Sequence, residues 1–320
     1  MNTRKMVIGL PVVLVLIVAV SFSVLNRSKG TILSSGQERE YPLNGTIVSS
    51  GHKREYLLYV PRSYDRAKPT PLVISLHGAL LGPAAQMGIT QWNRVADKHG
   101  FIVVYPSGMK SGVGLASGAL PIWPMEPEAV LMADVRFISE LIDTLEAAYN
   151  IDPARIYANG LSNGGGMAFA LSCKLSNRIA AIGAVAAAQL LPWSWCTDTT
   201  PVPMIAFHGT ADRFMPYNGG SSPIAPGTFP SVSTWAANWA RRNRCGANPV
   251  EAVVAADVTR LAYTDCADEA AVVLYTVKGA GHQWPGGVPM PEWFVGPTSR
   301  NIDASSLMWA FFVQHQLRRK

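Results

Sequence analysis

The stretch IYANGLSNGGG, residues 156–166, decides the fold. Its first residues are apolar, as in a buried strand, and a helical pattern runs from Met167 to about Cys173. Between the two, a Gly-x-Ser-x-Gly pentapeptide places Ser162 at a sharp turn, the arrangement called a nucleophile elbow. The pentapeptide alone is also typical of a turn with a surface serine, and it is the strand before it and the helix after it that favour the elbow.

The two glycines of the pentapeptide have a steric reason. Gly160 and Gly164 lie two residues either side of Ser162, and they lack the Cβ atoms that would collide where the strand and the helix approach each other. The N-terminal N–H groups of the helix point at the serine and favour negative charge there. The stretch therefore predicts a nucleophilic serine.

The composition indicates a globular protein with a sizeable core. The chain has 320 residues, of which 48% are hydrophobic and 15% charged, and this does not resemble a disordered chain. The length allows one large α/β domain or two small ones, but neither an internal repeat nor a linker is evident, so we expect one catalytic domain over residues 31–320. The net charge of +6 comes without a basic run interleaved with aromatics, which argues against nucleic-acid binding.

Residues 1–30 are expected to lie outside that domain. Basic residues precede and follow an apolar run, residues 6–25, whose length of roughly twenty residues is enough to span a bilayer as a helix. A cleaved signal peptide usually has a shorter apolar region and a small-x-small site, for which residues 21–23 are a weak candidate. The sequence predicts a signal-anchor or a signal peptide, and with either one an extracellular or periplasmic protein that meets the membrane only through this segment.

The cysteine pattern agrees with export. None of the four cysteines forms a C-x-x-C pair, so a zinc or redox motif is not indicated. Two disulfides have three possible connectivities, and we favour the sequential pairs Cys173–Cys196 and Cys245–Cys266. Each pair would close a loop of about twenty residues, worth roughly 3 kcal/mol in the chain-entropy model. The alternative is four buried free thiols.

Strand and helix patterns alternate along the chain after an early hairpin. The expected strands are 56–60, 71–76, 101–105, the elbow strand, 179–187, 203–207 and 271–277, and the expected helices are 85–98, 130–149, the elbow helix, 232–243 and 302–317. Loops rich in glycine and proline occupy residues 107–128 and 214–230. This alternation predicts an α/β fold, a mostly parallel sheet with helices on both faces, whose ligands bind outside the carboxyl ends of the strands.

Three residues at predicted strand ends form a chemical set. Serine is a poor nucleophile at neutral pH and needs a base, which in turn needs an acid to hold its tautomer. Ser162, Asp212 and His282 each follow a predicted strand, and their order along the chain is that of α/β-hydrolases. We expect them to be nucleophile, acid and base.

The base and the acid are chosen from several candidates. His282 follows a glycine-rich turn, whereas His77 and His208 precede glycine in strand-end turns and are expected to be structural. The remaining histidines, in polar segments or the closing helix, are His52, His99 and His315. Asp212 is preferred as the acid to three aspartates that lie close to the last strand or in polar loops, namely Asp257, Asp265 and Asp268.

A tetrahedral intermediate needs two hydrogen-bond donors for its oxyanion. One is expected to be the backbone N–H of Asn163, the residue after the nucleophile, and the other that of Ala79, with Leu80 as the alternative. Most of the nine tryptophans are expected to pack in the core, but Trp284 and Trp123 are candidates for the wall of a substrate pocket.

Four motifs together resemble one family of proteins. LHG (76–78), GLSNGG (160–165), HGTAD (208–212) and GHQWPGG (281–287) look like those of the polyhydroxybutyrate depolymerase and feruloyl esterase family of secreted α/β-hydrolases. The resemblance covers roughly residues 40–318. It implies an α/β-hydrolase fold and the catalytic roles given above.

Two further points follow from this resemblance. The positions of Cys173 and Cys196 resemble those of a family disulfide. The chain shows no linker or C-terminal polymer-binding module, so a soluble or oligomeric ester is expected rather than an insoluble polyester.

The leading hypothesis is a serine esterase that works through an acyl-enzyme on polyhydroxybutyrate-type, feruloyl or related esters. It implies no cofactor and no metal, and a small or oligomeric ester as the partner. The alternatives are a serine peptidase on the same fold and a non-catalytic ligand-binding relative.

Overall fold

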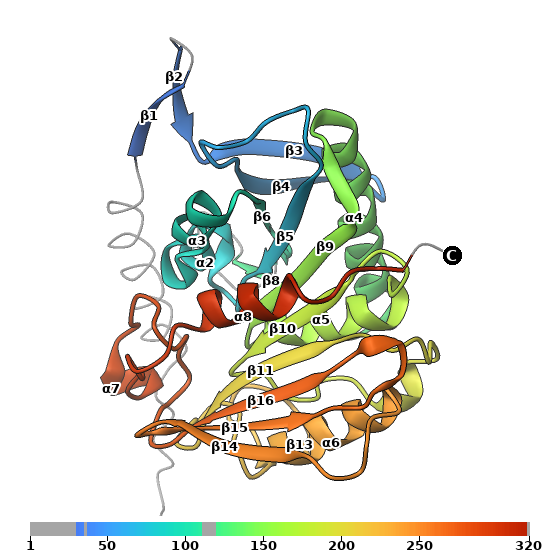
Figure 1. The fold of residues 1–320 in the computed structure, drawn as a ribbon, viewed down its shortest axis with the longest axis vertical. Helices are drawn as coiled ribbons and strands as arrows, with labels where there is room; N and C mark the ends of the chain where they lie inside the picture. Colours follow the sequence, from blue (N-terminus) through green and yellow to red (C-terminus); the bar gives the residue numbers. More distant parts are fainter. Residues whose placement is uncertain (1–29, 35–36, 111–119, 319–320) are drawn as a thin grey trace, which may run out of the picture.

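A single large sheet runs through the molecule (Figure 1). The computed structural model describes residues 30–34, 37–110 and 120–318. Ten strands hydrogen-bond in the order β14-β15-β16-β11-β10-β9-β5-β6-β4-β3. They are β3 (Leu43–Ser49), β4 (His52–Tyr59), β5 (Thr70–Leu76), β6 (Ile102–Pro106), β9 (Ile151–Leu161), β10 (Ala181–Val185), β11 (Met204–Gly209), β14 (Val250–Ala255), β15 (Val258–Tyr263) and β16 (Val272–Val277).

The central six strands, from β6 to β16, are parallel, and the two strands at each edge are antiparallel. This confirms the predicted fold class. The mostly apolar run of β5 is buried along its whole length, as expected for a parallel strand covered on both faces. Three small hairpins pair β1 (Gly30–Ser34) with β2 (Gln37–Tyr41), β7 (Met109–Lys110) with β8 (Pro121–Ile122), and β12 (Gly220–Ser221) with β13 (Thr228–Phe229).

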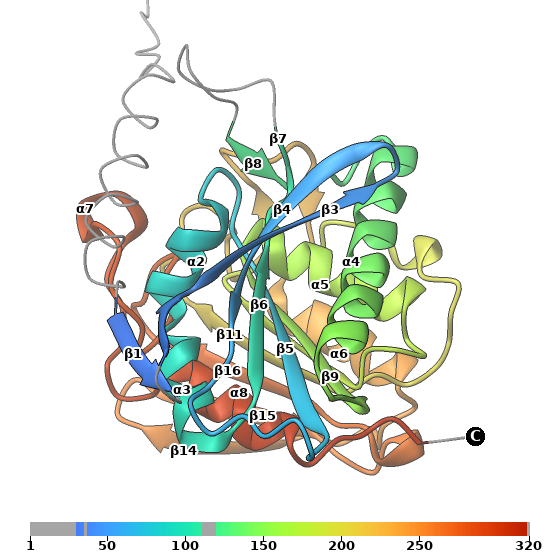
Figure 2. The ribbon, with the colours of Figure 1, turned by 90° about the horizontal axis from the view of Figure 1, so that it is seen from above.

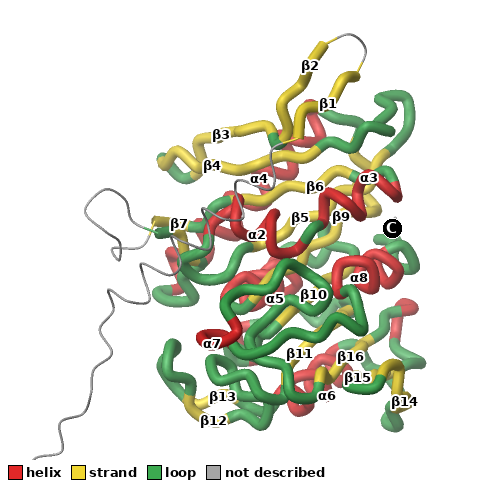
Figure 3. Tube along the Cα trace, turned by 90° about the vertical axis from the view of Figure 1, so that its left-hand side faces the viewer, coloured by secondary structure: helices red, strands yellow, loops and turns green. Residues whose placement is uncertain are grey.

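Helices cover both faces of the sheet (Figure 2). One face carries α2 (Gly82–Thr90), α3 (Trp92–His99) and α8 (Ala304–Phe312). The other carries α4 (Glu128–Ala148), α5 (Asn163–Lys174) and α6 (Val232–Arg242). A short helix, α7 (Glu292–Val295), lies among the loops that face the viewer in Figure 3. Two single 3-10 turns are η1 (Trp193–Trp195) and η2 (Ala267–Glu269).

The single helix predicted over residues 85–98 is wrong, because two helices occupy this segment. The backbone of Gln91 is left-handed, with φ 57° and ψ 28°, and it separates α2 from α3. The Gln91 amide donates to the Met87 carbonyl, and its side-chain Nε2 donates to the Gly88 carbonyl, so Gln91 caps α2. The residue at the break is a glutamine rather than a glycine or a proline, and the sequence pattern therefore does not reveal the break.

Two elements near the C-terminus also differ from prediction. The antiparallel hairpin β14–β15, which extends one edge of the sheet, was not predicted. The closing helix is shorter than the predicted 302–317: it begins after Asp303, whose carboxylate accepts from the Ser306 amide, and ends at Phe312.

The predicted disulfides Cys173–Cys196 and Cys245–Cys266 are both present, so the alternative of four free thiols is wrong. The predicted N-terminal span, residues 6–25, lies outside the described residues. Within the described ranges, no helix has both the length and the apolar character needed to cross a membrane.

Candidate active site

The predicted elbow is present between β9 and α5. Ser162 has φ 55° and ψ −118°, a backbone conformation that non-glycine residues rarely adopt, and it is 8% exposed. Its amide donates to the Val185 carbonyl of β10, while its carbonyl accepts from the amides of Gly165 and Gly166 in the first turn of α5. Such strain persists only where the surroundings hold it, and it is typical of functional positions.

The flanking glycines are required by close packing. A Cβ on Gly160 would lie under 3.0 Å from the backbone of Gly164, and a Cβ on Gly164 would lie equally close to the carbonyls of Leu76 and His77. The end of β5, the end of β9 and the start of α5 therefore touch through their backbones, which confirms the steric interpretation of the pentapeptide.

Asp212 and His282 form a buried pair. His282 Nδ1 lies 2.8 Å from Asp212 Oδ2, and the two residues are 7% and 5% exposed. The other oxygen, Asp212 Oδ1, accepts from the amides of Phe214 and Met215, both at 2.9 Å. An ionised carboxylate can only accept, so Nδ1 carries the hydrogen, and Nε2 of the neutral imidazole keeps its lone pair.

The surroundings keep Asp212 ionised. Burial by itself raises the pKa of its carboxyl, but the imidazoles of His282 and His208, with their hydrogen bonds, hold that pKa well below its usual range. His208 Nε2 lies 2.7 Å from the Met215 carbonyl and 3.4 Å from Asp212 Oδ2. This confirms the prediction that His208 is structural, because it braces the loop that carries the acid.

The sheet brings the three predicted catalytic residues to the edge formed by the carboxyl ends of its parallel strands. Along that edge Leu161 of β9 lies opposite Val185 of β10, and Val185 lies opposite Phe207 of β11. The end of β11 is in register with the end of β16, Gly209 opposite Val277. Ser162, Asp212 and His282 follow the carboxyl ends of β9, β11 and β16, as the alternating pattern predicts.

The candidate oxyanion donors are narrowed by existing hydrogen bonds. The Leu80 amide donates to the Pro121 carbonyl at 2.9 Å, which removes this alternative. Asn163 is the first residue of α5, where an amide has no acceptor within its own helix. In the part of the chain that the structure describes, the Ala79 amide likewise has no acceptor. Ala79 and Asn163 therefore remain the candidates.

His77 fixes the turn next to Ala79. Its Nε2 accepts from the Gly108 amide at 2.9 Å, so its Nδ1 donates to the Gly78 carbonyl at 2.8 Å. The imidazole is fully buried and stacks on Trp123, with ring centroids 5.0 Å apart. Burial lowers the pKa of His77 to about 4, so the residue is neutral at pH 7, and its predicted structural role is confirmed.

Because the His77 imidazole is buried, we expect the protein to lose stability in acid. In the unfolded chain His77 takes up a proton near the ordinary histidine pKa of 6.5, whereas in the folded chain its pKa is about 4. The unfolded state therefore binds more protons between these values, and His77 removes about 3 kcal/mol of stability as the pH falls from 7 to 4. Urea unfolding of wild type and His77→Gln across this range tests it: the wild type is expected to lose more.

The wild type must be compared with His77→Gln because Asp134 titrates in the same pH range and its effect on stability has the opposite sign. Burial raises the pKa of Asp134 to about 6, although Arg54 Nη2 lies 2.5 Å from its Oδ1. This contribution is common to the wild type and the variant. Parallel pH profiles in the two proteins would contradict the effect assigned to His77.

Trp123 and Trp284 were predicted to line a substrate pocket, but the structure buries both side chains. Trp123 is 0% exposed, stacks on His77 and donates from Nε1 to the His77 carbonyl. Trp284 is 1% exposed and donates from Nε1 to Ser305 Oγ. Both indoles are buried, and the N–H group of each has a partner inside the protein. Trp123 and Trp284 thus pack inside the protein, as expected for most of its tryptophans.

Several contacts at the site were missed by the sequence analysis. Asn163 and the backbone of Trp123 exchange two hydrogen bonds of 2.8 Å, which join the elbow to the segment after β8. Beneath the elbow, Asn159 Oδ1 accepts from Ser75 Oγ and Trp92 Nε1. Asn159 is a fully buried amide in the C-terminal half of β9, among Ile156, Ala158 and Leu161, and this exception in the apolar pattern is the signal that would have found it.

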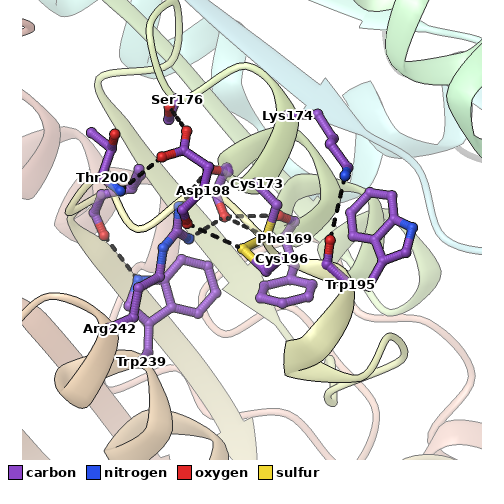
Figure 4. Close-up of a disulfide and its surroundings, with 12 residues drawn as sticks. Phe169, Cys173, Lys174, Ser176, Trp195, Cys196, Asp198, Thr200, Trp239 and Arg242 are labelled. Atoms are coloured by element: carbon purple, nitrogen blue, oxygen red, sulfur yellow. Dashed lines mark hydrogen bonds between the residues drawn. A yellow bond between two sulfur atoms is a disulfide. The ribbon is translucent and has the colours of Figure 1, made fainter.

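The far end of α5 is also fixed (Figure 4). The disulfide joins Cys173, in the last turn of α5, to Cys196, and Lys174 Nζ lies 4.3 Å from the ring centroid of Trp195. Arg242 of α6 donates to the Ser172 hydroxyl and carbonyl. The helix that carries the elbow is therefore held at both ends. Within the described ranges, no group of three or more His, Cys, Asp or Glu side chains is placed to hold a metal ion.

The chain is similar to several known proteins. A model of the family described as esterase PHB depolymerase matches residues 54–190. Feruloyl esterase B of Piromyces equi is 31% identical over 69% of this chain and 41% of its own length. The putative esterase NocK of Nocardia uniformis subsp. tsuyamanensis is 30% identical over 73% of this chain and 72% of its own length. The chain thus spans less than half of the first relative.

The fold is also similar to that of a solved esterase. The solved acetyl xylan esterase from Aspergillus awamori matches with a TM-score of 0.56 and 14% identity, over 84% of this chain and 99% of that one. By its sheet and its strand–serine–helix turn, the chain is an α/β-hydrolase. Within that class it belongs to the polyhydroxybutyrate depolymerase and feruloyl esterase family.

Proposed function

We propose that this protein is a serine hydrolase of carboxylic esters that works through an acyl-enzyme. The observation that carries this function is the buried hydrogen bond from His282 Nδ1 to Asp212 Oδ2, 2.8 Å long, at the sheet edge where Ser162 stands in the elbow. This bond leaves Nε2 of the imidazole as the free base. The substrates we propose are polyhydroxybutyrate-type, feruloyl or related esters, by analogy with the relatives.

The first half of the reaction forms the acyl-enzyme. His282 Nε2 takes the proton of the Ser162 hydroxyl as Oγ attacks the ester carbonyl. The carbonyl oxygen becomes an oxyanion, and the backbone N–H groups of Ala79 and Asn163 donate to it, aided by the N-terminus of α5. The C–O bond to the alcohol then breaks, and His282 returns the proton to the leaving oxygen.

The second half releases the acid. Water enters where the alcohol left, gives a proton to His282 Nε2 and attacks the acyl carbonyl. The second tetrahedral intermediate collapses to the free carboxylic acid, and Ser162 regains its proton from His282. Asp212 stays ionised throughout and balances the positive charge that the imidazole carries in each transition state.

The compartment proposed for this reaction is outside the cytoplasm. The chain contains two disulfides, Cys173–Cys196 and Cys245–Cys266, and such bonds persist in oxidising environments.

A fluorophosphonate probe tests the proposal. The wild type is expected to be labelled at Ser162 and to hydrolyse members of an ester panel with short-chain acyl, hydroxybutyrate-oligomer, feruloyl and acetyl-sugar groups. Ser162→Ala is expected to lose both labelling and turnover while its unfolding midpoint stays close to that of the wild type. Labelling that persists in Ser162→Ala would overturn the assignment of the nucleophile. Turnover of peptide anilides at rates comparable to esters would favour a peptidase.

A further inference from the structure

A row of aromatic rings leads from the His282 imidazole to the protein surface. Phe214 meets the imidazole edge to face, with ring centroids 5.4 Å apart. Phe294 lies 5.1 Å beyond Phe214, and Trp293 lies 5.8 Å beyond Phe294. The exposed fraction increases along the row, from the buried imidazole through two half-buried phenylalanines to Trp293, which is 66% exposed. We call these three side chains, Phe214, Phe294 and Trp293, the aromatic row.

The row is fixed relative to the imidazole. Its outer two rings belong to α7, and the amide of His282 itself donates to the Val295 carbonyl of that helix at 2.6 Å. Gln283 ties the segment further: its Nε2 donates to the carbonyls of Met290 and Gly296, and its Oε1 accepts from the Met290 amide. The inner ring, Phe214, follows the acid, and its amide donates to Asp212 Oδ1. Both ends of the row are therefore tied to the acid–base pair.

The exposed indole of Trp293 does not pack in the core as the buried tryptophans do. A side chain of this size binds through its face when it is exposed, because the ring offers a large apolar area with a negative π-face and loses little conformational entropy on binding. Isolated exposed apolar residues need no explanation, as for Val48 or Val253, which are also well exposed. Trp293 differs from them because it continues a set of rings that begins at the imidazole.

The chemistry decides which part of the ester lies there. In the proposed reaction the His282 imidazole returns its proton to the oxygen of the departing alcohol, so the alcohol part of the ester lies on the imidazole side of the scissile bond. The acyl oxygen lies on the opposite side, at the amides of Ala79 and Asn163. Rings that start at the imidazole therefore extend along the path of the alcohol.

We propose that the aromatic row is a subsite for the alcohol part of the ester, and that Trp293 stacks on a ring carried by that alcohol. The ring offers a flat face of C–H groups or π-electrons, as a pyranose or an aromatic alcohol does. This inference rests on the proposed function, since it needs His282 as the group that protonates the leaving alcohol. Trp293 is then a residue that sets specificity, because it binds a part of the substrate remote from the reacting atoms.

Acetate esters of primary alcohols test the subsite, because their acyl group and leaving-group chemistry are the same. Ethyl acetate carries no ring, benzyl acetate carries an aromatic ring, and 6-O-acetylglucose carries a pyranose. For each protein the ratio of kcat/KM for a ring ester to that for ethyl acetate is measured. In Trp293→Ala this ratio is expected to fall about tenfold, mostly through KM, as for the loss of one stacking contact. Trp293→Phe is expected to restore part of it.

A matched control variant is measured beside Trp293→Ala. Val253→Ser, which also removes an exposed apolar side chain but on the distant edge strand β14, is expected to leave all three activities unchanged. A fall confined to one ring ester supports the subsite and identifies the ring as pyranose or aromatic. An unchanged ratio in Trp293→Ala overturns the subsite while leaving the esterase assignment intact. A wild type that hydrolyses no ester and is not labelled at Ser162 overturns both.

Discussion

Asp212→Asn is expected to lower kcat for ester hydrolysis by about 10⁴-fold while the fold is retained. Asp212 Oδ1 accepts from the amides of Phe214 and Met215, so an asparagine would keep its carbonyl oxygen in that position. Its NH₂ group would then face His282 Nδ1, where Asp212 Oδ2 now lies at 2.8 Å. To accept from this donor, Nδ1 must lose its hydrogen, and Nε2 must carry it. The imidazole then has no lone pair for the proton of Ser162.

The readout separates this effect from a general loss of structure. Because the asparagine is nearly isosteric and keeps two of the hydrogen bonds, the urea midpoint of Asp212→Asn is expected to stay near that of the wild type. Asp257→Asn is the matched control, since it makes the same change at a half-buried carboxylate of the β14–β15 turn, and full activity is expected. Retention of more than about a tenth of wild-type kcat in Asp212→Asn would show that this carboxylate does not set the tautomer.

The strand ends that carry the proposed catalytic residues were predictable from sequence because the parallel sheet relates sequence to position in a simple way. The parallel strands all end at the same edge of the sheet, so a polar residue within a few positions after an apolar run is placed there without further information. Ser162, Asp212 and His282 satisfy this rule in the α/β-hydrolase order, and so does His77. The structural role of His77 was also predictable, since it precedes Gly78 at a point where the chain must turn.

The rest of the site depends on contacts between segments far apart in the chain. Phe214 lies in the loop after β11, and Phe294 lies in α7, eighty residues later; their 5.1 Å ring contact has no signal at either position. Trp284 was assigned to a pocket because it is close to His282 in sequence, yet its partner Ser305 belongs to α8 and draws the indole inward. Local patterns specify which strand end a residue occupies, and the packing of loops decides which way its neighbours point.

Gly160→Ala is expected to destabilise the protein by about 3 kcal/mol and to reduce kcat by about 10²-fold or more. The added Cβ would lie under 3.0 Å from the backbone of Gly164 and Gly165. Backbone atoms in the first turn of a helix cannot rotate away as a side chain can, so β9 and α5 must separate. Ser162 lies between them, and a shift of about 1 Å in its hydroxyl is enough to remove it from the geometry of attack.

Gly51→Ala supplies the comparison that isolates this steric effect. Gly51 lies in the β3–β4 turn at φ 77°, where an added Cβ meets nothing within 4 Å, so the substitution costs only the left-handed backbone conformation, about 1 kcal/mol. Urea unfolding and ester hydrolysis are measured for both variants. Equal losses of stability, together with full activity in Gly160→Ala, would mean that strand and helix can separate without moving the serine. The expected result is a larger loss of stability and a loss of activity in Gly160→Ala only, because the close approach of three backbones is what holds Ser162 in its strained conformation.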